Sequence, residues 1–595
     1  MVTEELINKA FSEAMAAHKY PDEEFLEKRG SSEVIFSFPG YWSVKDWYSE
    51  GAFGETGIDS AFFPSLRSIG NNEYAVVNKA FQERFKLVAE RSQLRNRVEE
   101  AVRDNMQIVF TGHSSGGPIA VLAAIWLLED YAKQKSQTLI SPLCLTFGSP
   151  LIGNHIFSHA LRRENWSRYF FHFVTRSDIV PRVFLSPLPS NEQHFQLLLE
   201  HFRLQSLSTS RGSHGAPKFA YDFFINVMRN ALTLTSHVAC KLMESSNLLF
   251  ETVTSFIKLS PYRPFGTYVF SNGNGKVVTL KNSDAVLQLL FYSCQPSSED
   301  GRDIAQRSFT EHFAYENELL QSFNGYISLD GEIESTDECN DMINKAADDI
   351  GLSTRGRLCL LAAGESETQK KKNKDKMDSK KGPTEKALKE IENYKNKCAV
   401  HKVGYYDSFK LQKNEEDFKA NVKRLELAGI FDEMIEMLKG YKLPDQFEGL
   451  KEWIDIGTRY RRLVEPLDIA NYYRHAKNED TGNYMKNGRP KRYRYTQRWR
   501  EHAEKMREES SGESCFWAEV EELWTLMKKQ PSEQKTANFG ARALKVQKEV
   551  SQWGQDKVIQ TDVFLNGSTF VKWWESLSFP NKLGEIEQLL NGLKN

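Results

Sequence analysis

The chain of 595 residues is 40% apolar and 27% charged, which is an ordinary globular composition. It is too long for one hydrophobic core, so its length predicts roughly two to four domains. The formal net charge of −2 gives no global reason to expect a nucleic-acid partner, and any basic surface must therefore be local.

The seven cysteines are scattered, odd in number and without a Cys-x-x-Cys spacing, which favours a reducing compartment over a disulfide framework or a zinc site. Residues 1–19 mix acidic with apolar side chains, so they do not have the pattern of a secretory signal. The longest apolar run, Ile119 to Leu128, is well short of the roughly 20 residues needed to cross a bilayer. We therefore expect a soluble, intracellular protein that holds neither a metal ion nor a cofactor.

Residues 33–38 are predicted to form a strand that ends at Pro39 and Gly40. In an α/β hydrolase the second donor of the oxyanion hole lies near the end of such a strand. No Ser or Thr follows the strand here, so Gly40 can offer only its backbone N–H. Gly40 is thus a candidate oxyanion residue, although the missing hydroxyl weakens that prediction.

The stretch from Gln107 to Tyr131 predicts a strand, a sharp turn and a helix, with the residues TGHSSGG at the turn. Gly112 and Gly116 flank Ser114 in a G-x-S-x-G pattern. This pattern is typical of a nucleophile elbow, because the strained turn leaves no room for a Cβ on either side. We expect Ser114 to be the nucleophile and the Ser115 N–H to be an oxyanion donor. The alternative is a glycine-rich turn whose serine only caps the helix.

Further strands are predicted at residues 143–147 and 169–175. They alternate with helical stretches, which indicates a mostly parallel sheet with helices on both faces. The second of these strands runs into Asp178. A carboxylate just beyond a strand's carboxyl end, after the nucleophile in the chain, is where the acid of a catalytic triad belongs. In the alternative, Asp178 only pairs with Arg176 or Arg182.

Residues 238–259 are helical in pattern, and one face of that helix is strongly apolar. Such a face is normally buried in the core of its own domain, and the residues alone favour that interpretation. The alternative is a row of anchors that docks into the groove of a partner. The apolar stripe consists of Leu249, Val253, Phe256 and Ile257.

A hairpin and a helix are predicted between residues 266 and 292, and His312 follows them. A nucleophilic serine needs an imidazole to take its proton and a carboxylate to orient that imidazole. The order Ser114, Asp178, His312 is the order found in α/β hydrolases. Taken singly, His312 is better explained as a surface histidine, and its position after the hairpin and the helix makes the triad interpretation equally good.

Residues 369–385 form a charge run with almost no large apolar side chain, which predicts a solvated linker or helix surface. We therefore divide the chain into residues 1–365, a linker at residues 366–385, and residues 386–595. The lysines of the run are either a nuclear import signal or merely solvated. Beyond the run the periodicity is helical without a convincing strand, so the second domain is predicted to be all-α.

In residues 484–500, YMKNGRPKRYRYTQRWR, basic side chains alternate with two tyrosines and a tryptophan. Guanidinium groups match phosphate oxygens and aromatic faces stack on bases, so this segment is a candidate surface for a nucleotide or nucleic acid. The alternative is that its arginines pair with Glu479, with Asp480 and with acids of neighbouring helices.

Three stretches together make a specific match to a known family. They are TGHSSGG with the surrounding first domain, LSPYRP at residues 259–264, and YRRLVEPLDIANY at residues 460–472 with NEDTG at residues 478–482. On these motifs the chain resembles the Enhanced Disease Susceptibility family of plant immune regulators over nearly its whole length. The resemblance implies a lipase-like α/β-hydrolase domain followed by an all-helical bundle domain.

The resemblance also implies functional residues. The triad positions fall on Ser114, Asp178 and His312, and His312 with Tyr315 matches the family's His-x-x-Tyr, although the family is thought to signal without hydrolysis. The stripe at residues 249–257 is similar to the family's docking helix, which reverses its interpretation as core. The positions that resemble the family's cavity-facing residues are Phe418, Arg424, His475, Lys477 and Arg492.

The implied partners are the phytoalexin-deficient and senescence-associated lipase-like proteins, each forming a heterodimer with a protein of this type. The cavity between the two helical domains resembles a receptor site for ribosylated adenine nucleotides that TIR-domain immune enzymes make. Ligand binding in the family recruits helper immune receptors with coiled-coil domains. The resemblance implies a location in the cytoplasm and the nucleus.

Three functions therefore compete. The leading hypothesis is a signalling regulator of plant innate immunity that senses a nucleotide as a heterodimer. The second is a serine acyl hydrolase that uses Ser114, Asp178 and His312. The third, a nucleic-acid-binding regulator, rests on residues 484–500 and is disfavoured by the near-neutral charge of the chain.

Overall fold

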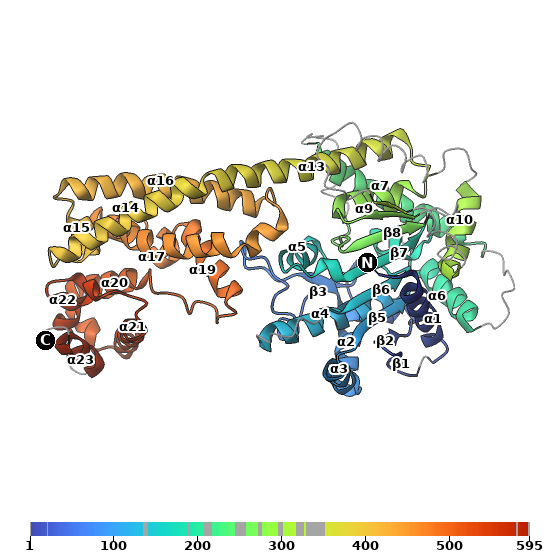
Figure 1. The fold of residues 1–595 in the computed structure, drawn as a ribbon, viewed down its shortest axis with the longest axis horizontal. Helices are drawn as coiled ribbons and strands as arrows, with labels where there is room; N and C mark the ends of the chain where they lie inside the picture. The colour runs from blue at the N-terminus through green and yellow to red at the C-terminus, as the bar shows by residue number, and fades with distance from the viewer. Residues whose placement is uncertain are drawn as a thin grey trace. The chain divides into compact units, whose positions relative to one another are not determined.

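A computed structural model of the chain shows two compact units (Figure 1). The first unit comprises Met1–Ser68 and Asn72–Lys371, and the second comprises Ile69–Asn71 and Lys372–Asn595. The residues that the structure describes are 2–20, 22–134, 141–188, 191–207, 217–243, 258–271, 277–295, 301–316, 326–328, 351–578 and 581–592.

The first unit is built on an eight-stranded sheet with the spatial order β1-β2-β5-β6-β7-β8-β9-β10. The neighbours from β2 through β5, β6 and β7 to β8 run parallel, while β1 pairs with β2, and β9 with β8, in the antiparallel sense. The strands are β1 (Leu26–Arg29), β2 (Glu33–Phe38), β5 (Gln107–His113), β6 (Leu143–Phe147), β7 (Phe170–Thr175), β8 (Thr267–Ser271), β9 (Val277–Leu280) and β10 (Tyr326–Ser328). A separate two-stranded sheet pairs β3 (Glu55–Gly57) with β4 (Val76–Asn78).

Successive side chains of a strand point to opposite faces, and both faces of this sheet are apolar. Phe36 and Phe110 stack 5.7 Å apart between ring centres on the face covered by α4 (Gly116–Gln134). Their neighbours Ile35 and Val109 lie on the other face in one cluster with α1 (Glu4–Ala17). A central strand that is buried on both sides explains why residues 108–110 are continuously apolar rather than alternating.

The remaining helices of the first unit connect these strands (Figure 1). They are α2 (Lys79–Arg91), α3 (Leu94–Arg103), α5 (His155–Arg163), α6 (Glu192–Leu207), α7 (Ala220–Leu242), α9 (Ser283–Tyr292) and α10 (Gly301–Thr310), with short 3-10 turns at Val180–Leu185 and Glu311–Phe313 among others. A mostly parallel sheet with helices on both faces confirms the predicted α/β-hydrolase class. Within the described residues, every helix is too short or too polar to span a bilayer.

The second unit is helical, as predicted. Its principal helices are α14 (Lys381–Val400), α15 (Tyr405–Leu411), α16 (Glu415–Lys439), α17 (Lys451–Arg474), α18 (Lys477–Asp480), α19 (Lys491–Ala503), α20 (Phe516–Lys529), α21 (Ala537–Gln555), α22 (Thr569–Ser576) and α23 (Gly584–Gly592). Aromatic stacking supports their packing, because the Phe431 and Tyr460 rings lie 3.8 Å apart and the Tyr406 and Trp517 rings 4.1 Å apart.

The charge run is helical rather than extended. It lies in α13 (Thr354–Ser379) and in the first turns of α14, and the division between the two units falls after Lys371. Lys376 and Lys380 both pair with Glu433 of α16. The surface of a long helix, which was one of the two predicted alternatives, therefore describes this stretch.

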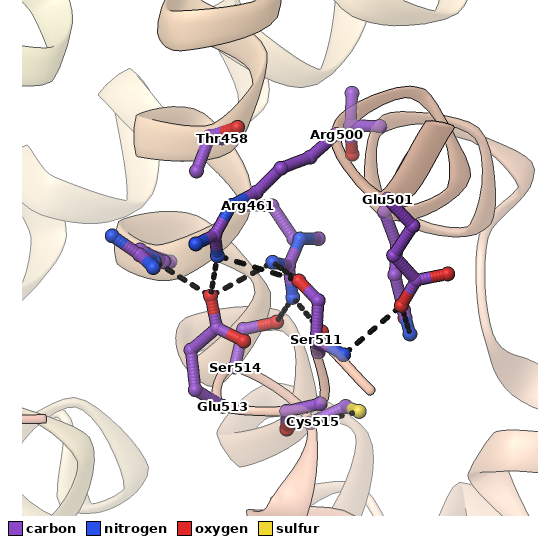
Figure 2. Close-up of polar contacts among 12 residues, drawn as sticks. Thr458, Arg461, Arg500, Glu501, Ser511, Glu513, Ser514 and Cys515 are labelled. Carbon is purple, nitrogen blue, oxygen red and sulfur yellow. Dashed lines mark hydrogen bonds and ion pairs between the residues drawn. The ribbon is translucent and has the colours of Figure 1, made fainter. Parts of the chain in front are cut away.

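A buried ion cluster ties α17 to residues 511–515 (Figure 2). The fully buried Arg461 guanidinium donates to the Ser511 main-chain oxygen at 2.7 Å, to Ser514 Oγ at 2.6 Å and to Glu513 Oε1 at 2.9 Å. Arg500 of α19 reaches the same Glu513 oxygen at 2.8 Å. Burial alone would raise the pKa of Glu513, but the neighbouring guanidinium groups lower it to about 2. The carboxylate is therefore charged at neutral pH and joins three parts of the helical unit.

Candidate functional site

The elbow between β5 and α4 has the backbone that its sequence predicts. Ser114 adopts a φ of 56°, in the left-handed region that is costly for a residue with a side chain. Its N–H donates to the Phe147 oxygen of the adjacent strand at 3.0 Å, which holds the turn in place. A Cβ on Gly112 would lie 2.3 Å from the Gly116 carbonyl, and one on Gly116 would lie 2.2 Å from the Phe38 oxygen. Both positions of the motif therefore require glycine.

Asp178 follows β7, His312 lies in the turn after α10, and the structure brings them together. His312 Nδ1 lies 3.1 and 3.0 Å from the two Asp178 carboxylate oxygens. The Tyr315 hydroxyl donates to Asp178 Oδ2 at 2.6 Å. Gly148 sits behind this group with a φ of 55°, and a Cβ there would lie 2.5 Å from Asp178 Oδ2. The carboxylate thus orients the imidazole, as a triad acid does.

The catalytic face of the triad is enclosed. The side chains of Ser114, Asp178 and His312 are all buried. Ser114 Oγ and His312 Nε2 have no hydrogen-bond partner among the described residues. The Phe202 ring of α6 covers His312, with 4.6 Å between the ring centres. Because Nδ1 faces a carboxylate, Nε2 is the nitrogen free to take a proton from a serine.

Two further histidines, His18 and His113, form a chain of hydrogen bonds next to the elbow. The Gly40 N–H donates to His18 Nδ1 at 3.0 Å, His18 Nε2 lies 2.9 Å from His113 Nδ1, and His113 Nε2 lies 2.7 Å from the His312 main-chain oxygen. A backbone N–H can only donate, so His18 must carry its proton on Nε2. His113 then accepts at Nδ1 and donates from Nε2 to the oxygen of His312. The contacts leave one tautomer for each neutral ring.

The burial of the His18 and His113 rings favours their neutral forms. It lowers the pKa of His18 to about 3 and holds the pKa of His113 well below the ordinary value. Sequence reasoning missed both residues. His113 is a variable position of the G-x-S-x-G pattern, and His18 precedes the first strand, so neither carries a catalytic signal of its own.

The predicted oxyanion donor Gly40 requires a correction. Its N–H is already engaged by His18, so in this structure it is not directed at a substrate. The next N–H along the chain, that of Tyr41, donates to the Ser115 hydroxyl at 2.7 Å. Ser115 stands directly after the nucleophile, where its own N–H can serve as an oxyanion donor. Its side-chain oxygen, however, accepts the hydrogen bond of the Tyr41 N–H, which belongs to the loop after β2.

Comparison with known proteins agrees with this geometry. The sequence pattern of class 3 lipases matches residues 35–187, and that of the Enhanced disease susceptibility 1 protein EP domain matches residues 389–588. Protein EDS1L of Arabidopsis thaliana is 42% identical over 96% of this chain and 95% of its own length. The chain belongs to the Enhanced disease susceptibility 1 family. It is therefore a lipase-like regulator of plant immunity.

Two lipase-like relatives of the family are more distant. Lipase-like PAD4 of Arabidopsis thaliana is 27% identical over 81% of this chain and 78% of its own length. Senescence-associated carboxylesterase 101 of the same plant is 24% identical over 86% of this chain and 77% of its own length.

Within the helical unit of this family member, Arg424 and Arg492 meet at one carboxylate. Arg424 pairs with Asp468 Oδ1, and Arg492 donates to Asp468 Oδ2 at 2.7 Å, where the Tyr493 hydroxyl also donates. Arg492 also donates to Asp432, at 2.9 and 3.2 Å, so the two guanidinium groups are paired with two carboxylates. His475 contacts the neighbouring Arg474 at the end of α17.

The other two positions with a predicted ligand role lie on the surface. Phe418 of α16 is 55% exposed, and Lys477 at the start of α18 is exposed. The predicted docking stripe of Leu249, Val253, Phe256 and Ile257 lies outside the described residues.

The basic and aromatic segment at residues 484–500 does not present its rings to solvent. Tyr493, Tyr495 and Trp499 are buried in the core of the helical unit. Arg489 forms a two-pronged ion pair with Glu465, at 2.6 and 3.2 Å. The interpretation as a surface that stacks on bases is therefore wrong, and the alternative of paired arginines describes the segment. Within the described ranges, His, Cys, Asp and Glu side chains form no cluster suited to a metal ion.

Proposed function

We propose that this family member signals as a heterodimer with a lipase-like relative of the PAD4 or senescence-associated type. An exposed apolar stripe on α16 supports this proposal. Phe418, Val422 and Leu425 are 55%, 61% and 56% exposed and follow each other at helical spacing along one face. The opposite face of α16 packs its own core through Leu427 and Phe431. A row of large apolar side chains on an otherwise charged helix is suited to a helix of a partner.

The proposed ligand is a ribosylated adenine nucleotide made by TIR-domain enzymes. The guanidinium groups of Arg424 and Arg492 and the exposed Lys477 support an anionic ligand, because guanidinium and ammonium groups bind phosphate oxygens. In this proposal, binding recruits helper immune receptors with coiled-coil domains, and the protein works in the cytoplasm and the nucleus.

The α16 stripe gives a direct test. Changing Phe418, Val422 and Leu425 together to Ser should weaken binding to the purified partner at least tenfold, because each buried side chain contributes about 1.5–3 kcal/mol. Leu411→Ser is the matched control, since Leu411 is 61% exposed but lies off this helix. Calorimetric titration of the partner into each full-length variant measures the affinity. Equal affinity for the triple variant and the control would refute an interface at the stripe.

A serine acyl hydrolase is the second candidate, and the contact between His312 and Asp178 is the observation that favours it. Its test is whether Ser114→Ala, expressed at the normal level, restores pathogen resistance in a plant that lacks this protein. Restored resistance means that signalling does not use the elbow chemistry. Lost resistance with intact partner binding means that an ester substrate is used.

A further inference from the structure

An oxyanion hole in this fold needs two N–H groups. One comes from the residue after the nucleophile, and the other comes from the loop that follows the strand paired with the elbow strand, which here is β2. Here that loop begins at Pro39, directly after β2. It lies against the elbow, because a Cβ on Gly116 would come within 3.0 Å of the Pro39 oxygen as well as 2.2 Å of the Phe38 oxygen. The loop is therefore in the position from which it must supply the second donor.

The first three residues of the loop offer no free donor. Pro39 has no N–H. The Gly40 N–H is taken by His18 Nδ1 at 3.0 Å, and the Tyr41 N–H is taken by Ser115 Oγ at 2.7 Å. The Ser115 hydroxyl also donates to the Tyr41 main-chain oxygen at 3.1 Å, so the loop and the elbow are joined in both directions. The loop N–H groups that could bind a carbonyl oxygen of a substrate thus already donate to side-chain acceptors of the protein.

The triad acid contacts the candidate base, whereas Ser114 Oγ and His312 Nε2 are not hydrogen-bonded to each other. Ser114 holds the strained elbow conformation, and the Asp178 carboxylate lies 3.0 Å from His312 Nδ1. Ser114 Oγ and His312 Nε2 are buried without a partner among the described residues. An unsatisfied hydroxyl and an unsatisfied imidazole nitrogen are costly to keep in a core, which is characteristic of groups reserved for chemistry rather than for stability.

We propose that the elbow is a latent acyl-transfer centre whose oxyanion hole is filled by the protein's own acceptors, Ser115 Oγ and His18 Nδ1. Removing either acceptor frees a loop N–H to act with the Ser115 N–H on the carbonyl oxygen of an uncharged carboxylic ester. We choose an uncharged ester because the triad side chains are buried and the Phe202 ring covers His312, and burying a charged substrate there would be costly. The inference is independent of the signalling proposal, so its failure leaves the heterodimer untouched.

The released centre would work as follows. Ser114 Oγ forms a bond to the ester carbon while its proton moves to His312 Nε2, and the carbonyl oxygen becomes an oxyanion held by the two N–H groups. When the carbon–oxygen bond of the alcohol breaks, His312 returns the proton to the leaving alkoxide. Water then repeats the sequence on the acyl-serine and releases the carboxylic acid.

The test measures covalent labelling of Ser114 by an alkyl fluorophosphonate, in which the serine oxygen displaces fluoride from phosphorus. All variants of the full-length protein carry Phe202→Ala, because the Phe202 ring covers His312 and limits access in any case. In that background, Ser115→Ala should label about a hundredfold faster, the size of effect that one oxyanion donor has on hydrolases. His18→Leu should also label faster, and both increases should vanish with Ser114→Ala.

Ser149→Ala is the matched control, because the Ser149 hydroxyl is buried beside the elbow helix but donates to Pro150 rather than to the loop. It should label at the rate of the parent. Two results would overturn the inference: a folded Ser115→Ala protein that labels no faster than the parent, or a Ser149→Ala protein that gains as much. If Ser115→Ala fails to fold, His18→Leu decides by the same criterion.

Discussion

His113 donates from Nε2 to the main-chain oxygen of His312 across 2.7 Å, and these two residues are 199 positions apart in the chain. The residue before the nucleophile thereby fixes the backbone of the candidate base. Because His18 lies on the other side of His113, a segment near the start of the chain, the elbow and the triad histidine form one hydrogen-bonded unit.

The histidine chain predicts a pH-dependent stability. The pKa of His18 is about 3 in the folded state and near 6.5 when unfolded, so the unfolded state binds more protons in between. Its stabilising contribution is therefore complete above about pH 6.5 and is lost as the pH falls toward 3. In His18→Leu, the slope of unfolding free energy against pH between 6 and 4.5 should be shallower by about 1.4 kcal/mol per pH unit.

Chemical unfolding of unit 1 at a series of pH values measures that slope. The exposed His401 offers a control in His401→Asn, which should keep the slope of the parent. Identical slopes for the parent and His18→Leu would show that His18 is not held neutral by the fold.

Two arginines on α17 should differ strongly in their contribution to stability. Arg461 is buried with Glu513, and removing one partner of such a pair costs about 3–5 kcal/mol. Arg459 makes a shorter pair with Glu392, at 2.6 Å against 2.9 Å, but both side chains are more than a third exposed, so that pair contributes at most about 1 kcal/mol. Arg461→Met should therefore lower the urea midpoint of the helical unit far more than Arg459→Met does. Equal losses of stability in the two variants would contradict a larger contribution from the buried pair.

The buried cluster around Glu513 should also make the stability of the helical unit depend on pH in the acidic range. The pKa of Glu513 is about 2 in the folded state, below its usual value, so its contribution is present above about pH 4.5 and is lost as the pH falls toward 2. Glu513→Gln should be less stable than the parent at pH 6, and the difference should shrink as the pH approaches 2. A difference that is constant with pH would mean that the carboxylate is not held ionised.

Gly148 provides a test of triad packing. Gly148→Ala places a Cβ in the left-handed region and 2.5 Å from Asp178 Oδ2, so we expect a loss of about 2 kcal/mol or more in the stability of unit 1. Gly364→Ala, in α13 with no atom within 4 Å of the added Cβ, should instead gain about 0.5–1 kcal/mol. Thermal unfolding of both variants checks the opposite signs.

The aromatic residues of α19 should behave as core. Trp499→Ala should cost about 3–5 kcal/mol in unfolding free energy, because the ring is buried and its indole N–H donates to the Glu448 oxygen. Lys491→Ala, at an exposed position of the same helix, should change stability by less than about 0.5 kcal/mol. Unchanged stability of Trp499→Ala would contradict a core position for the ring and would again favour residues 484–500 as a binding surface.

The sequence by itself determined the elements whose cause is local. The glycines around Ser114 are required by one turn, and the apolar residues within 33–38 and at 108–110 predict strands from their composition alone. The helical second unit follows from side-chain periodicity over tens of residues. The family motifs are likewise contiguous in the chain. These predictions needed no knowledge of which segments meet.

Only the tertiary structure decided the state of the site. The Gly40 N–H donates to His18, which lies 22 positions earlier at the end of α1, and only the packing of that helix decides this contact. Likewise, the alternation of arginine and tyrosine in α19 does not tell which side of the helix is buried. The physical reason is the same in both cases. A polar group's function depends on the partner that satisfies it, and in a folded chain that partner comes from residues distant in sequence.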